Sequence, residues 1–212
     1  MTEELAPARR RRTPTQDRSR ETFEAICAAA SSLIEEGGIA ALTTNAVARR
    51  AGVSITAVYA YFEDKWAIVH ELFNRFEQLR ADALRALFAD FDEREDWRPV
   101  IDETWARMAE FRVEVPGAMP LRHAMAGQPG LARLDYEGSI RSATLFADAM
   151  VRRRPSLSWE DAYRASWAVT LIAGVLIDDA VRDGTIAWDR LWEGTSILKL
   201  HLARYLDDEP GT

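Results

Sequence analysis

The stretch that most constrains the fold runs from Leu42 to Trp66, where the sequence has the pattern of two short helices joined by a tight turn. Thr44 can cap the first helix, because a threonine before an apolar-periodic segment is a helix start signal. Gly52 is expected to end that helix in the left-handed conformation, which glycine adopts at no steric cost. Ser54 then caps a second helix over residues 55–61. Two short helices, a turn containing glycine and an exposed second helix are typical of a helix-turn-helix.

The outer face of the second helix indicates what this motif contacts. It holds two tyrosines and small residues without any charge, and a major groove offers a partner for each of these side chains. Lys65 follows closely enough to neutralise a phosphate. The alternative is a helical hairpin packed inside a larger helical core. The predicted DNA-contacting residues are Thr43, Thr44, Asn45, Ser54, Ile55, Thr56, Ala57, Tyr59, Tyr61 and Lys65.

The sequence of this region resembles a known family. LTTNAVARRAGVS, followed by VYAYFEDKWAIV, is similar to the DNA-binding domain of the TetR family of bacterial regulators. The upstream family helix is matched from Arg18 to Gly37-Gly38, and the resemblance covers residues 18 to 75. Asn45 departs from the more basic residue that some members hold there. The resemblance implies a sequence-specific transcriptional regulator that binds a palindromic operator as a homodimer, with repression as the family default and ligand-responsive activation as the alternative.

Net charge and cysteine content restrict the other classes of function. The net charge of −7 lies entirely after residue 65, because residues 1–65 hold nine basic and nine acidic side chains. A neutral DNA-binding region on an acidic body would orient the protein toward a duplex.

The single cysteine, Cys27, is expected to be buried, and it excludes an internal disulfide. No apolar run is long enough to span a bilayer and the N-terminus lacks a secretory signal, so a cytoplasmic protein is expected.

The rest of the chain has the pattern of helices, and the predicted fold class is therefore all-α. We expect a disordered basic arm over residues 1–17, containing Arg9 to Arg12, and a three-helix helix-turn-helix domain over 18–64. A helical effector-binding and dimerisation domain is expected over 65–212. Its helices are predicted at 65–89, 97–112, 121–126, 131–153, 158–181 and 188–206.

The last two predicted helices are candidates for a dimer interface. In the TetR family the C-terminal helices pair with their copies in a second subunit, and the resemblance implies the same here. The helix before Asp183-Gly184 is apolar nearly all round in its second half, so it must be covered on more than one side. The alternative is one broad internal core. The predicted interface residues are Trp167, Thr170, Leu171, Gly174, Val175, Leu198 and Leu202.

The middle helices are candidates for an effector pocket, chiefly by the resemblance. They hold many large apolar side chains, including methionines that adapt to irregular shapes, together with a few polar anchors. The same residues can equally form an ordinary core. A small, mainly apolar effector is expected at Trp105, Met108, Phe111, Arg112, Met119, His123, Met125, Phe146 and Met150.

Three other classes of protein are alternatives to a regulator. A small enzyme with a helical body lacks a recognisable catalytic motif or phosphate-binding glycine loop, so no catalytic residue and no cofactor are expected. A metal sensor would have to use three scattered histidines, and no metal site is expected. A nucleoid protein would coat DNA broadly rather than occupy a fixed operator.

Overall fold

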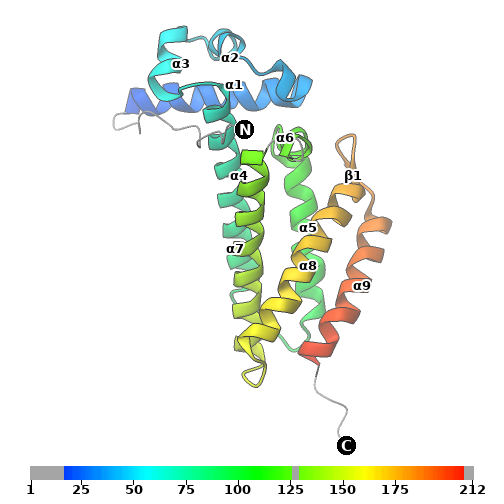
Figure 1. Cartoon of the computed structure of the whole chain (residues 1–212). Helices are drawn as coiled ribbons and strands as arrows, with labels where there is room; N and C mark the ends of the chain where they lie inside the picture. Colours follow the sequence, from blue (N-terminus) through cyan, green and yellow to red (C-terminus); the bar gives the residue numbers. More distant parts are fainter. Residues whose placement is uncertain (1–16, 126–128, 208–212) are drawn as a thin grey trace, which may run out of the picture. The chain divides into compact units, whose positions relative to one another are not determined.

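The computed structural model describes residues 17–125 and 129–207 (Figure 1). The expected basic arm lies almost wholly outside these described residues, and so does the side chain of Met125. Within the described residues the fold is all-α apart from one hairpin of two-residue strands, as predicted. The elements are α1 (Asp17–Ala41), α2 (Thr44–Ala51), α3 (Ile55–Tyr61), α4 (Lys65–Leu87), α5 (Arg98–Glu114), α6 (Ala118–Met125), α7 (Pro129–Arg153), α8 (Trp159–Ala180), β1 (Val181–Arg182), β2 (Thr185–Ile186) and α9 (Trp188–Leu206).

The chain forms two compact units. The first, here called the head unit, consists of the chain up to Glu77 together with Val115–Asp135. The second, the body unit, consists of Gln78–Glu114 and the chain from Tyr136 onward. The head unit therefore extends beyond residue 64 and includes the first part of α4, all of α6 and the start of α7. The chain passes between the units three times, so α4 is one of three covalent connections.

Aromatic side chains form the part of the head unit's core that lies next to the helix-turn-helix. Phe23 of α1 stacks on Phe62, with 5.3 Å between ring centroids, and meets the ring of Tyr61 edge-on at 5.6 Å. Leu121 of α6 and Leu131 of α7 belong to the same buried cluster. The α6 segment is also tied to α1 through a polar contact, because the backbone N–H of Gly117 donates to Glu35 Oε2 at 2.6 Å. The residues of α6 and of the start of α7 thus contribute to the core that supports α2 and α3.

The predicted helix boundaries after residue 64 agree with the structure to within three residues, and the hairpin that follows α8 was not predicted. Ser158 caps α8, because its Oγ accepts from the N–H of Asp161. After Ala180 the chain forms the β1–β2 hairpin, in which Val181 pairs with Ile186. Asp183 and Gly184 both adopt positive φ, at 50° and 72°, which is the geometry of a type I′ turn. The Asp183-Gly184 pair therefore turns a hairpin in addition to stopping a helix.

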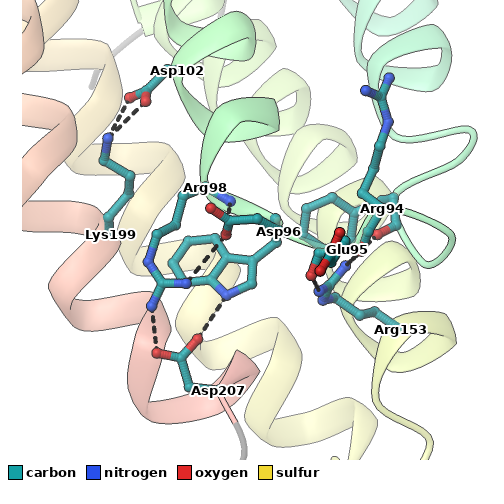
Figure 2. A network of polar contacts seen from close by, with 10 residues as sticks. Arg94, Glu95, Asp96, Arg98, Asp102, Arg153, Lys199 and Asp207 are labelled. Carbon is teal, nitrogen blue, oxygen red and sulfur yellow. Dashed lines mark hydrogen bonds and ion pairs between the residues drawn. The ribbon is translucent and has the colours of Figure 1, made fainter.

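The end of α9 is held to α5 by a polar network (Figure 2). Asp207 accepts hydrogen bonds from the indole N–H of Trp97 and from the guanidinium of Arg98. Closer to the middle of α9, Lys199 Nζ lies 2.7 Å from both carboxylate oxygens of Asp102. Arg153 of α7 donates to the backbone carbonyls of the α4–α5 loop, including Arg94 and Glu95. These contacts place one face of α9 against its own chain.

Candidate nucleic-acid interface

The first helix of the motif has its cap one residue earlier than the sequence pattern predicts. Thr43, with extended backbone angles, is the N-cap of α2, and its Oγ1 accepts from the N–H of Ala46 at 3.1 Å. The prediction that Thr44 caps this helix is therefore wrong. The Thr44 hydroxyl instead lies 3.3 Å from the Tyr59 hydroxyl on α3. Thr44 thus has no capping role and connects the two helices on their outer side.

The turn between α2 and α3 has the predicted geometry. Gly52 is left-handed, with φ 67° and ψ 28°. The N–H of Val53 then reaches back to the carbonyl of Ala48 at 3.0 Å, which satisfies an end carbonyl of α2. Ser54 caps α3, because its Oγ accepts from the N–H of Ala57 at 3.1 Å. The angle between the two short helices is therefore set by residues within the motif itself.

Most of the predicted DNA-contacting residues reach the surface. Tyr59 is the largest of them, with 43% of its surface exposed. Its neighbour on α3, Val58, is fully buried in the head core and anchors the helix from its inner side. The exposed residues also include Thr43, Asn45, Ser54 and Thr56. The other predicted contacts, Thr44, Ile55, Ala57 and Lys65, are partly buried.

Tyr61 is the exception, and the prediction that it lies on the exposed face is wrong. Only 7% of its surface is exposed. Its hydroxyl lies 2.8 Å from Ser19 Oγ and donates to the Ser19 carbonyl at 3.1 Å. Tyr59 and Tyr61 are two positions apart on a helix, so they point in directions about 200° apart and cannot share one face. This spacing is a signal in the sequence that identifies Tyr61 as the inward residue.

The basic residues near the motif have different roles. Arg50 is held by α1, donating to both carboxylate oxygens of Glu36 at 2.8 and 2.7 Å and to Ser32 Oγ at 2.6 Å. These hydrogen bonds from Arg50 lower the pKa of the Glu36 carboxyl. Arg49, the neighbouring residue, is exposed, and so is Arg18 at the start of α1. Sequence reasoning did not single out Arg49 and Arg18, although both carry charge beside the motif.

A second ion pair joins α1 to α4. Arg75 donates to both oxygens of Glu24, at 2.6 and 2.8 Å, and to Glu71 within α4. The hydrogen bond from Arg75 lowers the pKa of Glu24, although burial of the carboxyl works in the opposite direction. The guanidinium also lies over the ring of Phe23, 5.2 Å from its centroid. The first half of α4 is therefore held against the helix that supports the motif.

The predicted effector residues fall in both units of the chain. In the body unit the side chains of Trp105, Met108, Phe111, Phe146 and Met150 are all buried. Their neighbours differ, because Trp105 packs against Gly194 of α9 whereas Phe146 stacks on Phe88 at 4.9 Å. On α6, in the head unit, Met119 is partly buried and His123 is exposed.

Arg112, predicted as a polar anchor for an effector, is engaged with its own chain. Its Nε donates to Asp178 of α8, and its Nη1 donates to the carbonyl of Met108 at 2.8 Å. The guanidinium is almost fully buried. A buried charge of this kind is stable only when it is paired, so the bond to Asp178 is a structural requirement of the α5–α8 contact.

The predicted dimer residues divide into an outer and an inner set. Leu171 and Val175 of α8 are exposed, at 45% and 69%, and Trp167, Thr170 and Gly174 are less exposed. Leu198 and Leu202 of α9, however, are 2% and 0% exposed, so they are already covered within their own chain. The apolar side of α9 that carries these two leucines faces the core of its own chain. The exposed apolar residues of α9 are instead Ile197 and Leu200, together with Trp188 and Trp192.

Metal-ligating groups and membrane-spanning helices are both absent from the described part of the chain. Among residues 17–125 and 129–207, no three or more His, Cys, Asp or Glu side chains are grouped as metal ligands. None of the helices in these ranges has the length and apolarity needed to cross a bilayer. The thiol of Cys27 is buried, as expected.

Comparisons with known proteins agree on one family. Residues 26–72 match the family model described as bacterial regulatory proteins, tetR family. No curated protein matches the chain in sequence. A putative TetR-family transcriptional regulator from Mesorhizobium loti has a similar structure, with a TM-score of 0.72 at 18% identity, covering 90% of this chain and 99% of that one.

Another similar structure is that of SmeT, the repressor of the Stenotrophomonas maltophilia multidrug efflux pump SmeDEF. Its TM-score is 0.65 at 21% identity, and the match covers 91% of this chain and 96% of SmeT. A complex of SmeT with triclosan matches with a TM-score of 0.67 at 22% identity, covering 90% and 96%. The helix-turn-helix of this chain therefore matches the tetR family model, and the chain shares its fold with TetR-family transcriptional regulators.

Proposed function

We propose that this protein binds a palindromic DNA operator as a homodimer and represses transcription until a small, mainly apolar effector binds. The observation that carries the DNA-binding part is the outward face of α3. It exposes Tyr59 on a helix that is anchored in the head core by Val58. A rigid, uncharged helix with hydroxyl and methyl groups fits a major groove, where such groups meet base edges and thymine methyls.

The chemistry of each exposed residue of the helix-turn-helix suggests which part of the DNA it contacts. The hydroxyls of Tyr59 and Thr44, 3.3 Å apart, are suited to one phosphate, because each can donate to an anionic oxygen. Lys65 and Arg49 supply positive charge on either side of the motif. The residues left to read bases are those at the first turn of α3 and at the start of α2: Thr43, Asn45, Ser54, Ile55, Thr56 and Ala57.

The homodimer is supported by apolar surface that the single chain leaves uncovered. On α8, Leu171, Ile172 and Val175 are exposed at helical spacing, and on α9 Ile197 and Leu200 are exposed. Removing such side chains from water contributes about 25 cal/mol for each Å² of apolar surface buried. A second copy of the chain offers a matching apolar stripe about a two-fold axis, which also pairs two heads for the two halves of a palindrome.

The effector is supported by the composition of the body unit and by one related protein. Large side chains of α5 and α7, including Trp105, Phe111 and Met150, fill the interior of this unit. SmeT, which shares the fold, has been solved as a complex with triclosan. We infer a small apolar or aromatic effector that prefers one conformation of the body unit. Its differential affinity shifts the protein between states that bind the operator well and poorly.

Selection of binding sites from a random DNA pool by the full-length protein tests the central proposal. We expect one palindromic sequence to be enriched.

Tyr59→Phe and Lys65→Ala should weaken binding to all duplexes similarly, and Lys65→Ala should shallow the salt dependence by about one phosphate contact. Thr56→Ala should change the preference among sequences. Tyr205→Phe in α9 is a matched control. Enrichment of no palindrome would refute the proposal, and a promoter reporter distinguishes repression from activation.

A further inference from the structure

Lys65 begins α4 on a backbone that its neighbours hold in place. Asp64 caps the helix, because its Oδ1 accepts from the N–H of Ala67 at 2.9 Å. Ala67 and Ile68 are buried, at 2% and 0% exposure, in the same core cluster as Val58 of α3. The backbone of Lys65 is therefore fixed relative to α3, and only the long side chain of the lysine is left to be oriented.

The side chain of Lys65 contacts an aromatic ring and no carboxylate. Its Nζ lies 5.0 Å from the centroid of the Trp66 ring, which is within the range of a cation–π interaction. In the part of the chain that the structure describes, this ammonium group forms neither an ion pair nor a hydrogen bond. Arg50 and Arg75 of the same unit differ from it, because each donates to a glutamate. Lys65 thus keeps its whole positive charge for another partner.

The ring of Trp66 is itself held by the head unit. Trp66 is partly buried and packs against the core cluster of this unit. An aromatic ring orients an ammonium group without cancelling its charge, whereas a carboxylate in the same place would leave the pair with no net charge to offer a phosphate. A cation in the first turn of a helix also lies at the positive end of the helix dipole, so this position gives Lys65 no stabilising role there.

We propose that Trp66 is a positioning residue for DNA binding, whose ring holds the ammonium group of Lys65 in the orientation that contacts a phosphate beside the groove entered by α3. The inference rests on the proposed DNA-binding function and adds a residue that acts through Lys65. The free protein already holds the lysine in its bound conformation, so binding orders less of the side chain and costs less entropy. Because the contact is to a phosphate, its effect on affinity is the same for every duplex sequence.

A double-mutant cycle in the full-length protein tests this role. The variants are Trp66→Leu, which keeps an apolar side chain without an aromatic face, Lys65→Ala, and their combination. Trp66→Phe retains a smaller aromatic face and is the conservative variant. Leu33→Ala is the matched control, because Leu33 of α1 is another partly buried residue that packs against the same core cluster. The probes are the selected palindrome and a duplex of random sequence, titrated between about 50 and 200 mM salt.

Trp66→Leu should weaken binding to both duplexes by about twofold to fivefold, the range expected from one cation–π contact at a partly exposed site. Trp66→Phe should weaken it less, because phenylalanine is a weaker partner for a cation. Lys65→Ala should shallow the slope of log affinity against log salt by about 0.9, which is one phosphate contact. In the Lys65→Ala background, Trp66→Leu should have no further effect on affinity, because residues that act through one another are not additive.

Nuclear magnetic resonance of the Lys65 side chain gives a readout that core packing does not supply. Protons of the ε-methylene group that lie over the indole face are shifted upfield by the ring current. We expect this shift in the free protein and in its complex with the palindrome, and we expect its loss in Trp66→Leu. Leu33→Ala should lower the melting temperature of the protein but leave both the shift and the affinities unchanged.

Several results would overturn the inference while leaving DNA binding in place. Tighter binding by Trp66→Leu would mean that the ring withholds the lysine from DNA, and unchanged binding would mean that the ring does not orient it. An equal loss with and without Lys65 would mean that Trp66 acts only through the packing of the head unit. An unchanged salt slope in Lys65→Ala would remove the phosphate contact on which Trp66 acts. Failure of the wild type to bind either duplex would refute the proposed function itself.

Discussion

At the level of single residues, Gly117 connects α6 to α1 in a conformation that other residues rarely adopt. Its φ is +79°, and a β-carbon there would lie 3.1 Å from the backbone oxygen of Ser31 and 3.3 Å from Ile34 Cγ2. We expect Gly117→Ala to lower the free energy of unfolding by about 2–3 kcal/mol, since left-handed backbone alone costs about 1–2 kcal/mol and the contact with a backbone atom adds to it.

Gly52→Ala is the matched control for this measurement. Gly52 belongs to the same unit and has φ +67°, but a β-carbon there meets no atom within 4 Å. Urea unfolding should therefore show a loss of only about 1 kcal/mol. Equal losses for the two variants would mean that the close approach of α6 to α1 contributes nothing to stability.

At the level of elements, the two helices of the motif are too short to be stable without their caps and their packing. α2 has eight residues and α3 has seven, whereas isolated helices below about 12 residues are marginal in water. Thr43→Ala and Ser54→Ala should each lower the free energy of unfolding by about 0.5–2 kcal/mol, because each removes an acceptor from a helix N-terminus. Thr44→Ala is the control and should have little effect in urea unfolding. A larger loss for Thr44→Ala than for Thr43→Ala would contradict the assignment of the cap.

At the level of the whole molecule, α8 and α9 each present one apolar stripe inward and another to solvent. Val175 and Leu200 are 69% and 75% exposed, whereas Leu202 is fully buried. If the outer stripes pair two copies, Val175→Glu and Leu200→Glu should convert a dimer to a monomer at micromolar concentration, because a charge would then be buried without a partner.

Leu202→Ala is the contrasting variant for the same experiment. It should lower the free energy of unfolding by about 2–5 kcal/mol through the cavity that it leaves, while the assembled protein remains a dimer. Sedimentation velocity distinguishes the two kinds of change. A wild-type protein that sediments as a monomer would remove the dimer from the proposed function.

The sequence by itself determined the helical fold class, most helix boundaries, the Gly52 turn and the Ser54 cap. These features depend on neighbours within about four residues, which is the range of helix hydrogen bonds and caps. The family resemblance drawn from residues 18 to 75 also rests on such a local pattern, and the matched residues 26–72 agree with it.

Only the tertiary structure decided which face of each helix meets its own chain. The local pattern places Tyr61 outward and Leu198 and Leu202 at an open interface, but Tyr61 is held by Ser19, 42 positions away, and both leucines lie in the core of their own chain. A periodic apolar stripe shows that one side of a helix is covered without showing what covers it. That choice depends on contacts between residues distant in sequence, which no local pattern encodes.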